Sequence, residues 1–132
     1  MPYEDLYYLP HKISCPENAE KEFRVAFSSK ESDEHKSIVY FFLSEKPIPR
    51  VLGESRILYI GKSNTSLRSR YLRYSKKIFT NRSGKFYSHI IKNYGAISFG
   101  YFLSNDPKAD ERKYFREYLD KHLEYPPKSK VG

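Results

Sequence analysis

The sequence predicts an α/β (α+β) fold, in which a small, mostly antiparallel β-sheet made of a hairpin and a third strand packs with about three helices. Two runs of β-branched and aromatic residues, at 37–43 and 56–61, flank a long loop at 44–56 that contains prolines and a glycine, which is typical of a hairpin. A third run alternates at 97–103. Segments with helical spacing of apolar residues lie before and after this third run. The order favours a sheet with helices packed on it.

The residues before the hairpin show weaker patterns. Residues 1–20 contain three prolines and no clear periodicity, so we expect an extended arm or loop. Apolar and polar residues alternate at 22–28, which indicates a strand, and the acidic, serine-rich segment 29–36 is typical of a loop. A chain of 132 residues fits one compact domain. We divide it into an N-terminal extension at 1–36 and a main domain at 37–129.

Three helices are predicted in the second half of the chain. The first, capped by Thr65 or Ser66, has apolar residues four, three and four positions apart, at Leu67, Tyr71, Tyr74 and Ile78. The second runs from about 85 to 93 and ends before Gly95. The third runs from about 107 to 123 and begins with a capping aspartate and a proline.

Charge is unevenly distributed along the chain. The formal net charge is +8, yet the first 45 residues carry a net −4, and residues 62–92 hold nine lysines and arginines and no acid. Such a run favours an anionic partner, and the basic and aromatic residues that interleave at 70–74 suit phosphate contact combined with stacking. A solvated basic helix face is the alternative. The candidate phosphate contacts are Arg68, Arg73, Lys76, Lys77, Arg82 and Lys85.

Other features of the sequence exclude several classes of protein. The chain does not open with a basic segment and an apolar run, and no apolar stretch approaches the ~18 residues of a membrane span. We therefore expect a soluble, cytoplasmic protein with no membrane partner. The lone Cys15 cannot form an internal disulfide. His11, His35 and His122 have no companions at metal-ligand spacing, which argues against a zinc site.

Two short motifs on the predicted hairpin suggest a family. Ile38-Val39-Tyr40 on the first strand is followed by Tyr59-Ile60-Gly61-Lys62 on the second, and together they resemble the paired motif of the GIY-YIG nuclease family. Downstream, Leu67, Arg70 and Tyr74 have the spacing of that family's first helix. Glu117 stands nine residues before Pro126, as the family's glutamate precedes a proline-containing tail. The likeness covers about 37–129, and in it Ile38 replaces a glycine and Ser129 an asparagine.

This resemblance implies a function and a site. It implies an endonuclease that hydrolyses DNA phosphodiester bonds with Mg²⁺ or Mn²⁺, and catalytic residues at Tyr40, Tyr59, Lys62, Arg70, Tyr74 and Glu117. The chemistry of these residue types agrees with that function. Arg70 and Tyr74, four apart on one helical face, would meet at one spot, where a guanidinium can grip phosphate oxygens. Glu117 is a hard oxygen ligand for the metal, with Glu111 as its rival.

The general base and two neighbouring contacts stay open at this point. Tyr40 and Tyr59 could both face the site, and we favour Tyr59 because Lys62 lies close behind it and would favour a phenolate. Gly61 would end its strand tightly and let the backbone approach phosphate. His89 is either an additional base or phosphate contact, or an ordinary histidine on a helix surface.

Other functions fit parts of the pattern. A non-catalytic nucleic-acid-binding module would keep the basic face but would not need Arg70 and Glu117. A protein-interaction domain would not need Arg70 and Glu117 to lie on facing elements. A homodimer of the nuclease would cut both strands and a monomer would nick, and the sequence leaves both open. The charge split also suggests that the acidic N-terminal segment folds over the basic groove as a self-inhibiting arm.

Overall fold

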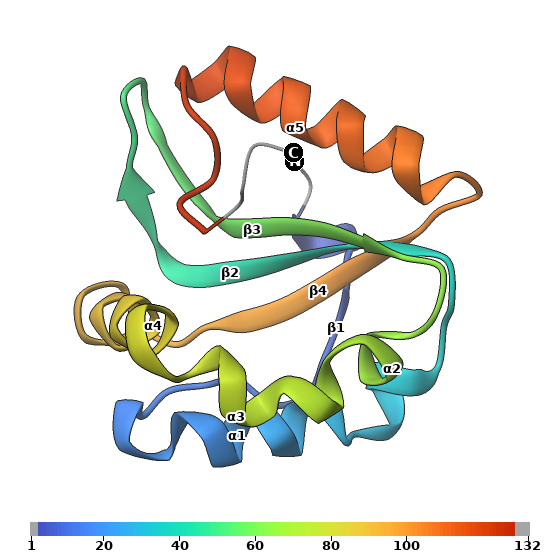
Figure 1. Cartoon of the computed structure of the whole chain (residues 1–132). Coiled ribbons are helices and arrows are strands. Elements are labelled where there is room, and N and C mark those ends of the chain that lie inside the picture. Colours follow the sequence, from blue (N-terminus) through green and yellow to red (C-terminus); the bar gives the residue numbers. More distant parts are fainter. Residues whose placement is uncertain (1–2, 129–132) are drawn as a thin grey trace.

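The protein is built on a four-stranded antiparallel sheet with the strand order β1-β4-β2-β3. The computed structural model describes residues 3–128, apart from the side chains of Ile78 and Asn81 (Figure 1). Strands β2 (Ile38–Pro49) and β3 (Glu54–Ser63) form a hairpin, and β4 (Ser98–Leu103) pairs with the other edge of β2. The two-residue strand β1 (Tyr7–Tyr8) pairs with β4. The predicted fold class is confirmed.

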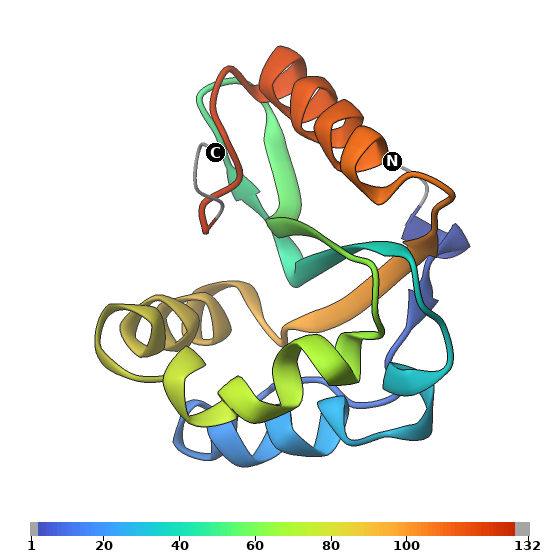
Figure 2. The same ribbon diagram turned by 45° about the vertical axis from the view of Figure 1, so that its right-hand side comes forward.

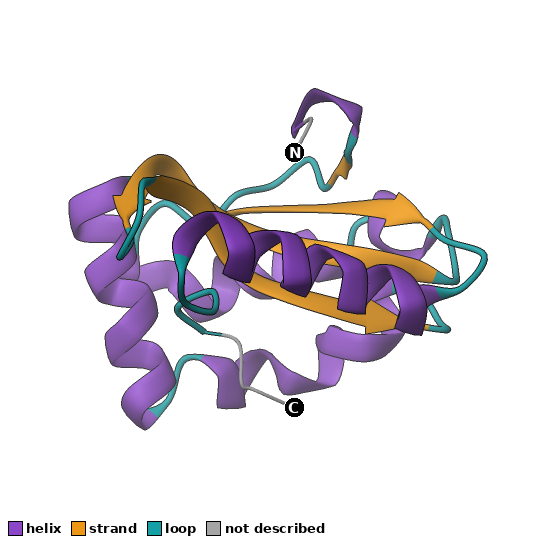
Figure 3. Cartoon of the chain, turned by 90° about the horizontal axis from the view of Figure 1, so that it is seen from above, coloured by secondary structure: helices purple, strands orange, loops and turns teal. Residues whose placement is uncertain are grey.

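Helices cover both faces of the sheet (Figures 1 and 2). Helix α5 (Pro107–His122) lies over the strands on one face, as Figure 3 shows from above. The opposite face carries α1 (Ala19–Phe27), α2 (Leu67–Tyr71), α3 (Ser75–Ile78) and α4 (Asn81–Tyr94). Single 3₁₀ turns occur at η1 (Tyr3–Asp5), η2 (Pro16–Asn18), η3 (Lys30–Asp33) and η4 (Leu72–Tyr74).

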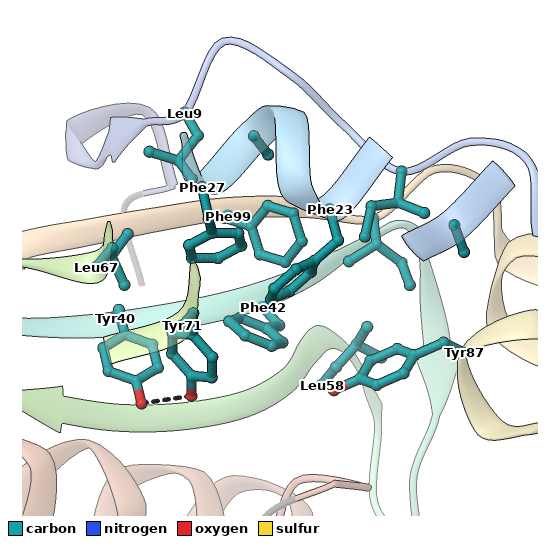
Figure 4. Close-up of a cluster of buried hydrophobic side chains, with 14 of the residues drawn as sticks. Leu9, Phe23, Phe27, Tyr40, Phe42, Leu58, Leu67, Tyr71, Tyr87 and Phe99 are labelled. Carbon is teal, nitrogen blue, oxygen red and sulfur yellow. Dashed lines mark hydrogen bonds between the residues drawn. The ribbon is translucent and has the colours of Figure 1, made fainter. Parts of the chain in front are cut away.

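Strand β2 is apolar along its first half because both of its faces are covered. Val39, Phe41 and Leu43 pack with Tyr118 of α5 in one buried cluster. Tyr40 and Phe42 point the other way, into a larger cluster that Figure 4 shows in close-up and that the helices beneath the sheet complete. Every side chain from Ile38 to Leu43 is at most 2 % exposed.

A β-bulge in β3 puts two neighbouring side chains on one face of the sheet. Tyr59 pairs with Phe42 and Ile57 with Leu43, so Leu58 is an extra residue in β3. Leu58 and Tyr59 therefore both contact the larger cluster, although neighbours in a regular strand point to opposite faces. Tyr59 faces this cluster because it pairs in register with Phe42, and the bulge turns Leu58 to the same face.

The hairpin lacks the long loop expected at 44–56. Strand β2 continues to Pro49 and β3 begins at Glu54, so the connection spans only residues 50–53. Prolines are tolerated here because β4 pairs with β2 only as far as Leu43, and the register against β3 shifts between Leu43 and Ile48.

The N-terminal segment differs most from expectation. The predicted strand at 22–28 is wrong, because these residues belong to helix α1, whose buried positions Ala19, Phe23, Ala26 and Phe27 follow helical spacing. Leu9 and Ile13 join the same buried cluster. Residues 3–36 are therefore part of the main fold rather than an arm, and Ser129, where the predicted domain ends, lies outside the described residues.

The predicted first helix is broken into short pieces. Helix α2 ends at Tyr71, a 3₁₀ turn follows at η4, and α3 begins at Ser75. Of the two candidate caps the structure selects Ser66, whose hydroxyl accepts from the amide of Ser69 at 3.2 Å and donates to Asp33 at 2.6 Å.

The two later helices agree better with expectation. Helix α4 begins at Asn81, four residues earlier than predicted, and ends at Gly95, which has a φ of 87°. Helix α5 has the predicted bounds to within a residue and its predicted aspartate cap, Asp106. None of the helices in the described part of the chain combines the length and apolar character needed to cross a membrane.

Candidate active site

A groove of about 970 Å³ opens beside the edge strand β3, between α5 on one side and α2 and α4 on the other. We call this site the groove and define it by the residues that line it. They are Phe42, Tyr59, Ile60, Lys62, Tyr71, Ser83, Tyr87, Lys108, Glu111, Arg112, Phe115, Arg116, Leu119, Tyr125 and Lys128. Five of these side chains are cationic and one is acidic, so the groove is suited to an anionic partner.

A pair of buried tyrosines lies directly behind the groove. Tyr40 is 1 % exposed, and its phenol is 2.6 Å from that of Tyr71, which lines the groove (Figure 4). The ring of Tyr40 lies across Gly61, where a β-carbon would overlap the ring. The glycine at position 61 thus gives Tyr40 room to reach helix α2, and a backbone contact of Gly61 with phosphate stays a prediction.

Burial decides between the two candidate bases. It raises the pKa of Tyr40 above the ordinary range of a phenol, and the nearby Tyr59 adds to this, while the hydrogen bond from Tyr71 and the charge of Arg70 only partly oppose it. Burial likewise raises the pKa of Tyr71. Tyr40 therefore serves as a neutral, structural phenol. Tyr59 is half-buried and lines the groove, so it is the tyrosine that a substrate can reach.

Arg70 does not itself line the groove, but it lies beside three phenols, and two of them, those of Tyr59 and Tyr71, do line it. Its guanidinium lies 5.5 Å from the ring centre of Tyr71 and interacts with Tyr40, Tyr71 and Tyr59. Partial burial lowers the pKa of Arg70, but the tyrosines outweigh burial and leave the pKa raised. The side chain is exposed and permanently charged, so it is available to an anion.

Lys62 and Glu111 line the groove from opposite sides, Lys62 from β3 and Glu111 from α5. Burial raises the pKa of Glu111, and the charge of Lys62 opposes the rise. Glu111 is half-buried and is the one carboxylate among the described residues that line the groove. Of the two carboxylates considered as the metal ligand, Glu111 is therefore the one that lines the groove.

Glu117, the carboxylate favoured from the sequence, is placed elsewhere. It is exposed on α5, does not line the groove, and lies beside Tyr114. Six residues separate it from Glu111, which at ~100° per residue turns the two side chains about 120° apart around the helix. The sequence spacing between Glu117 and Pro126 does not determine which side of α5 faces the groove.

Tyr74 is also displaced from its expected place. The 3₁₀ turn at η4 changes the helical phase after Tyr71, so Arg70 and Tyr74 do not share one regular helix face. Tyr74 is 44 % exposed, lies outside the groove, and carries the ammonium group of Lys77 at 5.8 Å from its ring centre. Tyr71 takes its place beside the arginine.

The basic residues predicted as phosphate contacts all lie outside the groove. Arg68, Arg73, Lys76, Lys77, Arg82 and Lys85 are exposed on the helices beneath the sheet. Lys85 borders a smaller hollow together with Glu17 and Glu20. His89 is an exposed helix residue whose side chain contacts Asn93, so it corresponds to the surface histidine of the two alternatives.

Sequence reasoning missed most of the residues that make the groove cationic. Lys108, Arg112 and Arg116 line it from α5, at a regular spacing of four that the sequence does display. Phe115 and Tyr125 also line it, from α5 and from the segment that follows. No described residue before Phe42 lines the groove, so the acidic N-terminal segment does not cover it; this segment packs instead on α2 and α3, and a self-inhibiting role stays a prediction.

Known proteins offer no guide to this site: comparison of the chain with protein-family models, with curated proteins and with solved structures found no match. Within residues 3–128, no three histidine, cysteine, aspartate or glutamate side chains gather into a metal-binding group. A single carboxylate can still hold Mg²⁺ when water and substrate phosphate supply the remaining oxygens, and the donor set around Glu111 fits that case.

Proposed function

We propose that the protein is a divalent-metal-dependent endonuclease that hydrolyses DNA phosphodiester bonds in the groove. The observation that carries the proposal is that Tyr59 and the carboxylate Glu111 line one cationic groove, with the guanidinium of Arg70 beside Tyr59. The paired motifs at Ile38–Tyr40 and Tyr59–Gly61 support it through their resemblance to the GIY-YIG family.

Each residue has a role that follows from its position. Arg70 and Lys62 hold the scissile phosphate and offset the negative charge that grows on it. Tyr59, which lines the groove, acts as the general base that takes a proton from the attacking water. The water oxygen bonds to phosphorus as the bond to the leaving oxygen breaks, and solvent protonates the leaving group. Bound Mg²⁺ or Mn²⁺, held by Glu111, supplies Lewis-acid stabilisation of the phosphate.

A non-catalytic nucleic-acid-binding module is the second candidate. The five cationic side chains of the groove against one carboxylate favour it, because this ratio suits binding without chemistry. Such a module would bind DNA with or without metal and leave it intact. It would also depend on Lys108, Arg112 and Arg116 more than on Glu111.

Cleavage of supercoiled plasmid distinguishes the two functions. We expect the wild-type protein to nick or linearise plasmid in Mg²⁺ but not in EDTA, and Arg70→Ala to lower the rate at least about 100-fold. Arg68→Ala is the matched control, because Arg68 is an exposed cation on the same helix, whereas Arg70 lies beside Tyr59 and Tyr71, which line the groove. Equal cleavage by the wild type and Arg70→Ala would contradict the proposal. Binding without cleavage by the wild type would favour the second candidate.

A further inference from the structure

Three aromatic side chains present rings to the groove from three different segments. Tyr59 comes from β3, Phe115 from α5 and Tyr125 from the segment after α5, and all three are half-buried. The rings of Phe115 and Tyr125 lie 6.2 Å apart with an angle of 60° between their planes. Phosphate binding alone needs no such rings, whereas unpaired bases stack on them readily.

A row of cations runs beside these rings. Lys108, Arg112 and Arg116 are exposed on α5, and a spacing of four residues puts successive members ~6 Å apart along the helix. That separation is comparable with the distance between consecutive phosphates of an extended strand. The row can thus follow one backbone while the rings beside it and on β3 receive the bases.

The segment at residues 124–128, which we call the tail, closes one end of the groove. The amide of Lys128 donates to the carbonyl of Leu58 at 2.9 Å, which attaches the tail to the edge of β3. The ammonium group of Lys128 donates to Ser83 on α4 at 2.8 Å and lies over the ring of Tyr87. The tail therefore connects α5, β3 and α4, and Figure 2 shows it descending between α5 and α4.

The hairpin anchors the other end of the tail. The guanidinium of Arg50, beside the hairpin turn, donates to the carbonyl of Tyr125 and to the carboxylate of Glu124, at 2.8 Å each. The side chain of Arg50 is 11 % exposed and that of Glu124 33 %, so the ion pair is partly shielded from water, and with the hydrogen bond to Tyr125 it ties the tail to the hairpin. A duplex, with its bases stacked inside and a second backbone to accommodate, would meet this tail before a base reached Tyr125.

We propose that the groove receives a single unpaired DNA strand, with its bases stacked on Tyr59, Phe115 and Tyr125 and its phosphates on the α5 cations. The inference rests on the proposed nuclease function, whose substrate class it specifies: DNA with a single-stranded segment, such as a flap, bubble or overhang. Sequence preference is expected to be weak, because every base offers a ring face to stack.

The first test measures binding in EDTA by fluorescence anisotropy. The probes are a labelled single-stranded DNA, a duplex and a single-stranded RNA of the same sequence. We expect the single-stranded DNA to bind at least tenfold more tightly than the duplex, and Tyr125→Leu and Phe115→Leu each to weaken it about tenfold. Tyr125→Phe should bind like the wild type, since it keeps the ring. Tyr74→Leu, which removes an exposed ring outside the groove, is the matched control.

The outcomes separate this inference from the nuclease proposal. Duplex binding as tight as single-strand binding, or no loss with Tyr125→Leu in a variant that melts like the wild type, would overturn the inference. Binding of the RNA but not of the DNA would overturn its assignment to DNA. In Mg²⁺, cleavage of duplex DNA as fast as of flap DNA would overturn the inference but leave the nuclease proposal standing. A preference for binding single strands without any cleavage would overturn the nuclease proposal but leave the inference standing.

Discussion

The ring of Tyr40 fills the space that a β-carbon on Gly61 would need. This one relationship couples the two hairpin motifs physically, because the glycine of the second strand lets the tyrosine of the first cross the strand and meet Tyr71. The motif is therefore a packing device, and its second tyrosine, Tyr59, lines the groove.

Gly61→Ala is expected to destabilise the fold by about 2 kcal/mol or more, because neither the Tyr40 ring nor the strand can move aside freely. Gly100→Ala is the matched control in another strand of the sheet, β4, since its β-carbon would meet the flexible side chains of Leu6 and Tyr8 instead of a fixed ring. Urea unfolding measures both. Equal losses for the two variants would contradict the packing role, and Tyr40→Leu should recover part of the loss in the Gly61→Ala background.

The hydrogen bond between Tyr40 and Tyr71 should appear as an energetic coupling. Tyr71→Phe leaves the buried Tyr40 phenol without this partner and is expected to cost about 1–2 kcal/mol. The double variant Tyr40→Phe with Tyr71→Phe should cost less than the sum of the single changes, because no phenol is then left unpaired. Additive losses in a double-mutant cycle would show that the two hydroxyls act independently.

Glu111→Gln is expected to change the pH dependence of stability. Because burial raises the pKa of Glu111 above its unfolded value, its contribution is fully present below the unfolded pKa and is lost as pH rises through the folded pKa. The glutamine variant, which resembles the protonated acid, should therefore gain stability relative to the wild type between about pH 4 and pH 7. The gain is small, because the side chain is only partly buried. Denaturant titration at several pH values measures the difference in unfolding free energy between the variant and the wild type. A difference that shrinks with rising pH would contradict this expectation.

The cations of α5 and those of the helices beneath the sheet can be compared directly. Arg112→Gln should weaken DNA binding and reduce the slope of log affinity against log salt by about 0.7–0.9, the share of one phosphate contact. Arg73→Gln, which changes an exposed cation outside the groove, should leave that slope unchanged. A reduced slope with Arg73→Gln and an unchanged slope with Arg112→Gln would instead indicate that the basic run at 62–92 is the binding surface.

The sequence predicts elements well where local pattern and tertiary setting agree. β2, β3, β4 and α5 have continuous apolar or clearly capped segments, and the structure has all of them. Helix α1 is mistaken for a strand because residues 22–28 also alternate, although the buried Phe23, Ala26 and Phe27 already have helical spacing. The break after Tyr71 has no proline or glycine to signal it.

The candidate site shows the same division. Tyr59, Lys62 and Arg70 could be selected from motif spacing because they lie within one short hairpin-to-helix segment. Choosing between Glu111 and Glu117 requires the rotation of α5 about its axis, which packing of Tyr118 against the sheet determines. The role of Tyr125 depends on how the tail returns to β3, a long-range contact with no local signal.

The rate of DNA cleavage by Glu111→Gln compared with Glu117→Gln tests the central claim most directly. Both changes remove one negative charge from α5 and keep the side-chain shape, but only Glu111 lines the groove. With Mg²⁺ and a flap substrate under single-turnover conditions, we predict that Glu111→Gln lowers the rate at least about 100-fold, while Glu117→Gln cleaves at the wild-type rate. Full activity of Glu111→Gln together with loss in Glu117→Gln would contradict the account.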